Sequence, residues 1–241
     1  MVFVRRRRLA AIVAVALAAA VALSSCDRDG SSSGSGARPA PQPVVYVAVG
    51  ASDSVGVGAT DPKTQAWPQV FLREALPAGS RLTNVAVSGT RTDRALTEQV
   101  PKAVAANPDV VTVWLSVNDL TGLVDAKTYG EQLRQVVHAL RRGGDTMVLV
   151  GNTPEVDQLP VIRRSGVPAA LVEKRVDDYN AAIEEVVRAE GAVLVDLHAK
   201  SEKAEADGEL AALTAADGFH PSTAGHARIA DAFAKAYADA S

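Results

Sequence analysis

Five short apolar runs alternate with longer stretches of helical periodicity, and this alternation constrains the fold more than any other feature of the chain. The runs are rich in valine, as is typical of strands buried on both faces of a sheet. The stretches between them place apolar residues three or four positions apart, as amphipathic helices do. The expected strands are residues 44–49, 82–87, 110–115, 147–150 and 192–197, and the expected helices are residues 64–76, 91–106, 126–142, 169–189 and 222–240.

Strands that alternate with helices imply crossover connections and a parallel sheet covered on both faces. We therefore expect an α/β fold, a three-layer α/β/α sandwich around a five-stranded parallel sheet. Residues 155–168 form a polar insertion that we expect to be a loop near the ligand-binding edge. Residues 200–216 are expected to form a short helix and a loop that leads to Asp217.

The N-terminal segment has the composition of a targeting sequence. Arg5 to Arg8 precede an apolar run at residues 9–23, which ends in Leu-Ser-Ser-Cys. This order is the pattern of a secretory signal, and the run is shorter than the about 20 residues of a membrane-spanning helix. Leu-Ser-Ser-Cys resembles the bacterial lipobox, which implies lipid modification of Cys26. The alternative is an uncleaved anchor, which also places the domain outside the cytoplasm.

The expected organisation is a lipoprotein signal peptide at residues 1–25, a lipid-anchored flexible linker at 26–43 and one domain at 44–241. The linker is rich in Ser, Gly and Pro, which gives an extended, flexible chain. Cys26 is the only cysteine, so no intramolecular disulfide is possible. Removal of the signal peptide takes away four arginines and changes the formal net charge from −3 to −7. This acidic balance argues against nucleic-acid binding.

Ser52 follows the first expected strand directly, in the sequence Gly-Ala-Ser-Asp-Ser at residues 50–54. Ligands of open parallel sheets bind outside the carboxyl ends of the strands. Ser52 is therefore a candidate nucleophile. Ser54 is a rival, and either serine could instead cap a helix.

His220 and Asp217 are the candidate base and its orienting acid. They lie three residues apart in Asp-Gly-Phe-His-Pro, so the carboxylate can reach the imidazole within one turn. Such a carboxylate fixes the histidine tautomer and stabilises the imidazolium. We expect the other histidines to be structural or solvated: His138 within a helix, His198 at the end of the fifth strand and His226 on the outer side of the last helix.

Two residues after successive strands are candidate donors to an oxyanion. Gly89 follows the second strand and offers a backbone N–H, and Asn118 follows the third and offers a side-chain N–H₂. A turn glycine and a helix cap are the alternatives for these two positions.

These dispersed blocks resemble those of the SGNH hydrolase superfamily, also called GDSL esterases and lipases. The family has four separate sequence blocks: Gly-Asp-Ser, a glycine, Gly-x-Asn-Asp and Asp-x-x-His-Pro. The matching residues occur here in the same order, and the resemblance covers nearly all of residues 44–240. It implies a flavodoxin-like fold and a serine esterase with Ser52, His220 and Asp217 as catalytic residues. The oxyanion hole would then consist of the backbone N–H groups of Ser52 and Gly89 and the side chain of Asn118.

Two positions depart from the family pattern. Ala51 replaces the aspartate before the nucleophile, and Ser116 replaces the glycine of the third block. Neither change removes a reacting group. Three functions remain open: hydrolysis of small acyl, lipid or glycan esters, acyl transfer to cell-envelope glycans, and glycan binding by an inactive lipoprotein.

The sequence contains no phosphate-binding loop and no group of His, Cys or acidic residues with the spacing of a metal site. We therefore expect no metal site, and the resemblance to the SGNH hydrolases implies no cofactor. The expected partners are an ester substrate and the membrane, which the chain contacts through lipidated Cys26. The expected location is extracytoplasmic, on a bacterial cell membrane, and the oligomeric state is open.

Overall fold

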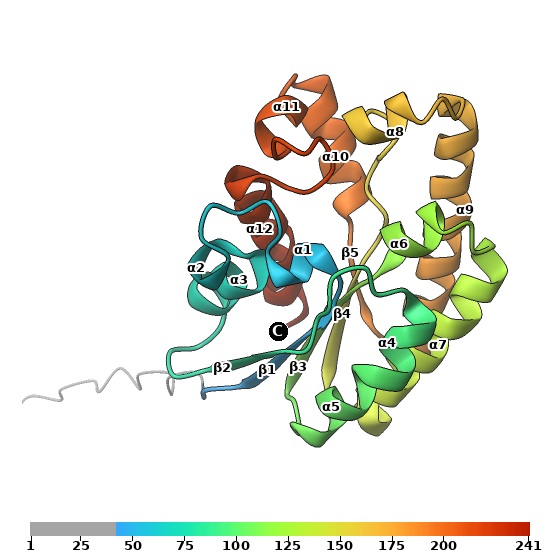
Figure 1. Ribbon diagram of the computed structural model, residues 1–241. Helices are drawn as coiled ribbons and strands as arrows, with labels where there is room; N and C mark the ends of the chain where they lie inside the picture. The colour runs from blue at the N-terminus through green and yellow to red at the C-terminus, as the bar shows by residue number, and fades with distance from the viewer. Residues whose placement is uncertain (1–41) are drawn as a thin grey trace, which may run out of the picture. The chain divides into compact units, whose positions relative to one another are not determined.

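The computed structural model describes residues 42–241 and shows one five-stranded sheet in which all neighbouring strands are parallel (Figure 1). The strand order is β2-β1-β3-β4-β5. This confirms the expected α/β fold. Cys26 and the expected signal peptide lie outside the described residues, as does most of the linker. The strands are β1 (Val45–Gly50), β2 (Arg81–Asn84), β3 (Val110–Trp114), β4 (Met147–Gly151) and β5 (Val193–Val195).

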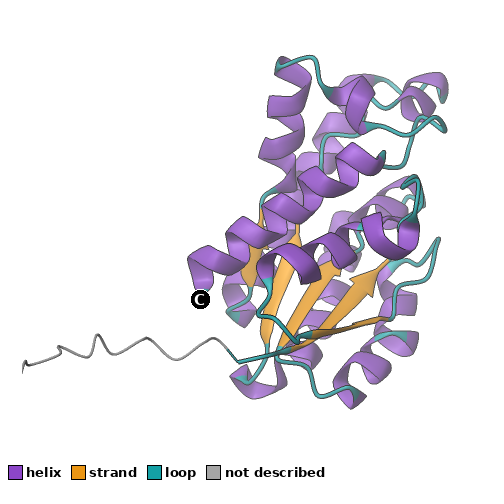
Figure 2. Cartoon of the chain, turned by 90° about the vertical axis from the view of Figure 1, so that its left-hand side faces the viewer, coloured by secondary structure: helices purple, strands orange, loops and turns teal. Residues whose placement is uncertain are grey.

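Helices cover both faces of the sheet (Figure 2). Alternate residues of β1 show the two layers, because Tyr46 packs into one apolar cluster and Val47 into the other. Within residues 42–241, no helix is long and apolar enough to cross a bilayer. One face carries α2 (Pro62–Gln65), α3 (Trp67–Ala75) and α12 (Thr223–Ala240), and the other carries α4 (Thr92–Glu98), α5 (Val100–Ala105), α7 (Ala126–Arg141) and α9 (Ala169–Glu190).

Two helices that the periodicity predicts as continuous are each broken near a proline. Pro68 and Pro101 lie in the first turns of α3 and α5 and have no N–H to continue a preceding helix. The backbone of Ala66, between α2 and α3, is extended at ψ 140°. Each proline therefore starts a new helix instead of extending the old one.

Short helices gather at the carboxyl ends of the strands, where the sequence predicts mostly loops. The expected loop at 155–168 contains α8, and β5 ends earlier than predicted because α10 begins at Leu197. These short elements surround the end of the sheet at which Ser52 lies (Figure 1). They are α1 (Ser52–Val55), α6 (Ser116–Thr121), α8 (Pro160–Arg164), α10 (Leu197–Ala206) and α11 (Leu210–Leu213).

Candidate active site

Ser52 begins α1 directly after the end of β1, so the sheet fixes its position. Ser52 is 8% exposed, so its hydroxyl can be reached from solvent although the turn around it is buried. The last residue of β1, Gly50, is held by the side chain of Gln99. The Gly50 N–H donates to Oε1 of Gln99 at 3.0 Å, and Nε2 of Gln99 donates to the Gly50 carbonyl at 2.9 Å. No local pattern in the sequence indicates this brace, because Gln99 and Gly50 are 49 positions apart.

We expect Gln99→Ala to lower the free energy of unfolding by about 2–4 kcal/mol, because it leaves the buried Gly50 N–H unpaired and opens a cavity. Urea denaturation measures the change. Gln135→Ala is the control, since the Gln135 side chain only reaches the Glu131 carbonyl on the exposed side of α7. That variant should stay within about 0.5 kcal/mol of the parent protein. Equal stability of all three proteins would contradict the role of Gln99.

His220 lies on a tight loop just before α12. The backbone N–H groups of Phe219 and His220 both donate to Oδ1 of Asp217, at 2.9 and 3.0 Å. Gly218 has a φ of +73°, and a Cβ there would come within 2.9 Å of Pro160. The turn therefore requires glycine at this position, and it presents the Asp217 carboxylate to the His220 ring.

Ser52, His220 and Asp217 form a continuous chain of hydrogen bonds. Nδ1 of His220 lies 2.6 Å from Oδ2 of Asp217, and Nε2 lies 2.9 Å from Oγ of Ser52. A carboxylate can only accept, so Nδ1 carries the proton and Nε2 is left to accept from the serine hydroxyl. Residues 168 positions apart in the sequence thus meet at the carboxyl edge of the sheet.

The charge on Asp217 is stabilised where it lies. Burial would raise the pKa of this carboxyl group, but the hydrogen bonds from the His220 ring and the two backbone N–H groups lower the pKa below its usual value. Asp217 therefore stays ionised at neutral pH, as an acid that orients a histidine must.

The two neighbours of Ser52 that carry polar groups are placed differently. Ser54 is completely buried, and its Oγ has no hydrogen-bond partner within residues 42–241. It therefore makes no hydrogen bond to His220. Burial raises the pKa of Asp53 to about 6, although the nearby His220 opposes the shift.

Gly89 and Asn118 lie on adjoining parts of the same edge. Gly89 is exposed, with a φ of +76° and open space where a Cβ would stand. The Asn118 side chain donates to the Thr90 carbonyl at 3.0 Å, which uses one of its two N–H bonds. Asn118 borders a small cavity with Ala51 and Asp53, and it borders an open depression with Gly89.

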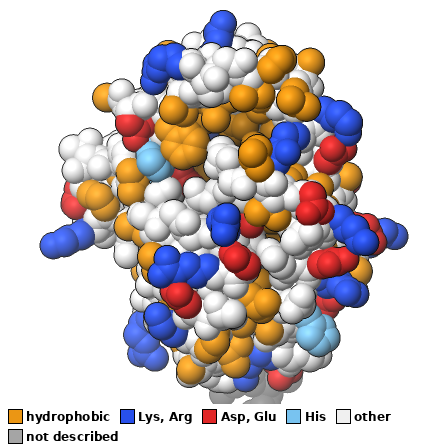
Figure 3. All heavy atoms as spheres, turned by 45° about the vertical axis from the view of Figure 1, so that its right-hand side comes forward, with side chains coloured by type: hydrophobic (Ala, Val, Ile, Leu, Met, Phe, Trp, Pro, Cys, Tyr) orange, Lys and Arg blue, Asp and Glu red, His pale blue; other side chains and the backbone are white. Residues whose placement is uncertain are grey.

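An apolar pocket of about 130 Å³ opens beside His220. Figure 3 shows such a hollow, lined with hydrophobic side chains and with a histidine at its edge. Phe219 borders the pocket and packs edge-on against the His220 ring, with centroids 5.0 Å apart. Its apolar wall includes Val117, Val156, Leu159, Leu197, Leu210 and Ile229.

The structure corrects the expected positions of two other histidines. His226 is completely buried instead of outward-facing: Nδ1 accepts from the Trp67 N–H at 3.3 Å, and Nε2 donates to the Val57 carbonyl at 3.0 Å. Burial lowers its pKa. His198 lies in the first turn of α10 and not at the end of β5. The exposed ring of His138 contacts Glu190 at 3.0 Å.

The structure also brings together a group of potential metal ligands that the sequence analysis did not recognise. Ligand atoms of Glu155, His198 and Glu202 all lie within 4.8 Å of one another. His198 and Glu202 are four residues apart and share a face of α10, so two of the three residues could be paired from the sequence. Glu155 comes from the loop after β4, which sequence periodicity does not place.

Comparisons with known proteins identify the family of the chain. The model of the GDSL-like Lipase/Acylhydrolase family matches residues 48–228. Among solved structures, TesA is 21% identical with a TM-score of 0.60, and the match covers 78% of this chain and 94% of TesA. No match was found among curated proteins.

Two esterases have similar folds. The psychrotrophic esterase EstA from Pseudoalteromonas sp. is 14% identical with a TM-score of 0.62, over 81% of this chain and 97% of EstA. A variant of Axe2, an acetyl-xylooligosaccharide esterase from Geobacillus Stearmophilus, is 19% identical with a TM-score of 0.63. The match covers 81% of this chain and 94% of Axe2. With three quarters of the chain inside the family model, this protein is a hydrolase that belongs to the GDSL-like lipase/acylhydrolase family, the SGNH hydrolases.

Proposed function

We propose that this protein is a serine esterase that hydrolyses carboxylic esters with a short acyl group. The observation that carries the proposal is the chain of hydrogen bonds from Ser52 through His220 to Asp217. A hydroxyl with an imidazole acceptor and an ionised carboxylate behind it is the arrangement that activates serine for acyl transfer.

In the proposed mechanism, Oγ of Ser52 attacks the ester carbonyl while its proton passes to Nε2 of His220. The negative charge on the carbonyl oxygen is held by the N–H groups of Ser52 and Gly89 and by the second N–H of Asn118. The ester C–O bond then breaks, and His220 returns the proton to the leaving alcohol. Water attacks the acyl-serine in the same way, which releases the acid and restores Ser52.

The apolar pocket beside His220 supports the choice of acyl group. Its walls are largely aliphatic, which suits a hydrocarbon chain. At about 130 Å³, it is well below the roughly 300–1,000 Å³ of sites for drug-sized ligands. A short acyl chain fits a space of this size better than a long one.

A series of p-nitrophenyl esters tests the proposal. We expect kcat/KM to be highest for acetyl to hexanoyl esters and to fall for palmitoyl ester. Added sugar acceptors should leave the free acid as the main product, whereas an acylated sugar would identify a transferase. Folded protein that cleaves none of these esters but binds glycans would contradict an esterase function.

We propose further that the protein works outside the cytoplasm, tethered to the membrane through Cys26. The support is the order of basic residues, apolar run and Leu-Ser-Ser-Cys at the N-terminus. Palmitate should label the parent protein in cells and not Cys26→Ala, and equal labelling of both would contradict the tether.

A further inference from the structure

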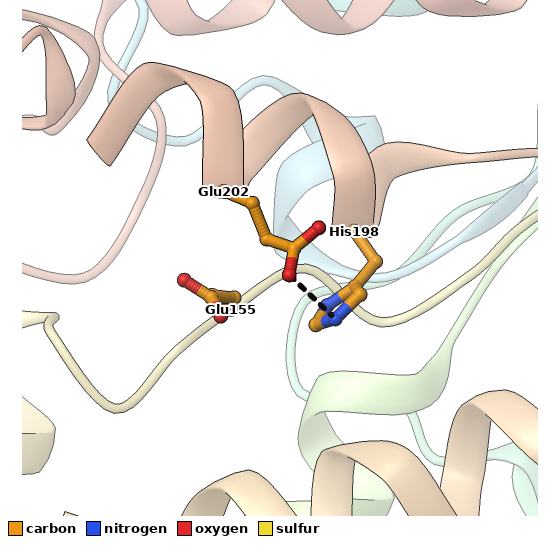
Figure 4. Close-up of side chains that lie close together, drawn as sticks. All are labelled: Glu155, His198 and Glu202. Atoms are coloured by element: carbon orange, nitrogen blue, oxygen red, sulfur yellow. Dashed lines mark ion pairs between the residues drawn. The ribbon is translucent and has the colours of Figure 1, made fainter. Parts of the chain in front are cut away.

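The group Glu155, His198 and Glu202 lies outside the proposed catalytic residues and combines one imidazole with two carboxylates. Figure 4 shows Glu202 and His198 on one side of α10, with Glu155 facing them from the loop after β4. Oε1 of Glu202 lies 3.8 Å from Nε2 of His198, which is too long for a hydrogen bond. The contact between His198 and Glu202 is therefore a long ion pair, which Figure 4 marks with a dashed line, and not a hydrogen bond.

His198 differs from the other three histidines in having no hydrogen bond on its ring. Its side chain is 23% exposed, and Nδ1 is buried without a partner within residues 42–241. The rings of His138, His220 and His226 each make at least one hydrogen bond. Because the ring of His198 makes no hydrogen bond within residues 42–241, its Nε2, the nitrogen that lies nearest Glu202, is available to a ligand.

Negative charge is concentrated around Glu155. Its carboxyl group hydrogen-bonds to Glu205 and has the carboxyl groups of Asp157 and Glu202 close by. Such crowding of carboxyl groups is unfavourable unless protons or a cation neutralise it. A divalent cation between Glu155 and Glu202 would remove the repulsion.

The backbone under these side chains is held in place. The Ser201 hydroxyl accepts from the Glu155 N–H at 2.8 Å and donates to the His198 carbonyl at 2.7 Å, so it joins the loop after β4 to α10. The His198 N–H donates to Oδ1 of Asn152 at 2.8 Å. Ligand-bearing segments that are fixed in this way need only side-chain adjustment to close on an ion.

We propose that Glu155, His198 and Glu202 form a binding site for a divalent transition-metal ion of the Zn²⁺ type. Zinc binds imidazole nitrogen and carboxylate oxygen at about 2.0–2.2 Å, which places neighbouring ligand atoms about 3.4 Å apart in a tetrahedron. Rotation of the two glutamate side chains can close the present separations, which are at most 4.8 Å, to this value. Three protein ligands leave the fourth position to water.

The position of the site defines what the ion would do. Glu155 and Ser201 also line the apolar pocket beside His220. A bound ion would fasten the loop after β4 to α10 and so fix one wall of that pocket. The ion is a structural clamp in this proposal, and the steps at Ser52 proceed without it.

Isothermal titration of the full-length protein, free of an affinity tag and stripped with EDTA, tests the site with Zn²⁺ and Mg²⁺. We expect one Zn²⁺ per chain, weaker binding of Mg²⁺ because imidazole favours transition metals, and at least about a tenfold loss of Zn²⁺ affinity in His198→Ala. Excess Zn²⁺ should raise Tm by roughly 5 °C in the parent protein. Glu202→Gln keeps the side-chain volume and should lose affinity as well.

His138→Ala is the matched control, because His138 also pairs with a glutamate but belongs to no group of three possible ligands within residues 42–241. It should bind Zn²⁺ like the parent protein. Circular dichroism of each metal-free variant shows whether it is folded. If His198→Ala does not fold, the Zn²⁺ affinity of Glu202→Gln tests the site instead. Absence of Zn²⁺ binding, equal binding in folded Glu202→Gln, or equal affinity for Mg²⁺ would overturn the proposal.

Discussion

Ser52→Ala is expected to lower kcat for ester hydrolysis by about 10⁶-fold, the loss seen when a serine hydrolase loses its nucleophile. The Ser52 hydroxyl is the group in contact with Nε2 of His220 at 2.9 Å, so no other oxygen can give its proton to that nitrogen in this geometry. The change removes one largely buried oxygen with one hydrogen bond to His220, and the free energy of unfolding should change by only about 1 kcal/mol. Initial rates with p-nitrophenyl butyrate and a urea titration measure both effects.

Ser54→Ala is the matched control for this variant. Ser54 is two residues away and was the rival nucleophile in the sequence, but its hydroxyl is buried without a partner within residues 42–241. We expect its kcat to stay within a few-fold of the parent value. If Ser54→Ala were the inactive variant, the assignment of the nucleophile would be wrong.

Asp217→Asn is expected to lower kcat by about 10⁴-fold while leaving the fold intact. The backbone N–H groups of Phe219 and His220 would hold the amide oxygen at the position of Oδ1. The amide N–H₂ would then face Nδ1 of His220, which would have to accept instead of donate. The ring proton would move to Nε2, and His220 could no longer accept the proton of Ser52.

Asp125→Asn tests whether this loss is specific. Asp125 is also an exposed carboxylate that accepts from a backbone N–H, that of Thr128, but it caps α7 away from Ser52. Its kcat should equal that of the parent protein. A similar loss in both variants, or none in Asp217→Asn, would show that Asp217 does not orient His220.

The strands and the larger helices could be predicted because they depend on local patterns. The apolar runs and the 3.6-residue spacing reproduce the element order, and two motifs indicated Ser52 and the pair Asp217 and His220. The breaks at Pro68 and Pro101 were also visible in the sequence, since proline cannot continue a helix. Their effect was underestimated because the apolar spacing runs on through both prolines.

The remaining errors concern contacts between distant segments. His226 is on the same face of α12 as Ala230 and Phe233, and its polar ring is buried because Trp67 and Val57 supply a donor and an acceptor. Gln99 braces Gly50 from 49 positions away, and Glu155 reaches α10 from a loop. Nothing local in the sequence specifies these partners.

Labelling with a fluorophosphonate tests most directly whether Ser52 is activated by His220. The probe phosphonylates only an activated serine, so we expect one adduct per chain, located on Ser52 by peptide mass spectrometry. Ser54→Ala should label like the parent protein, and His220→Ala should not label. Folded parent protein that remains unlabelled, or that carries the adduct on another serine, would contradict the account.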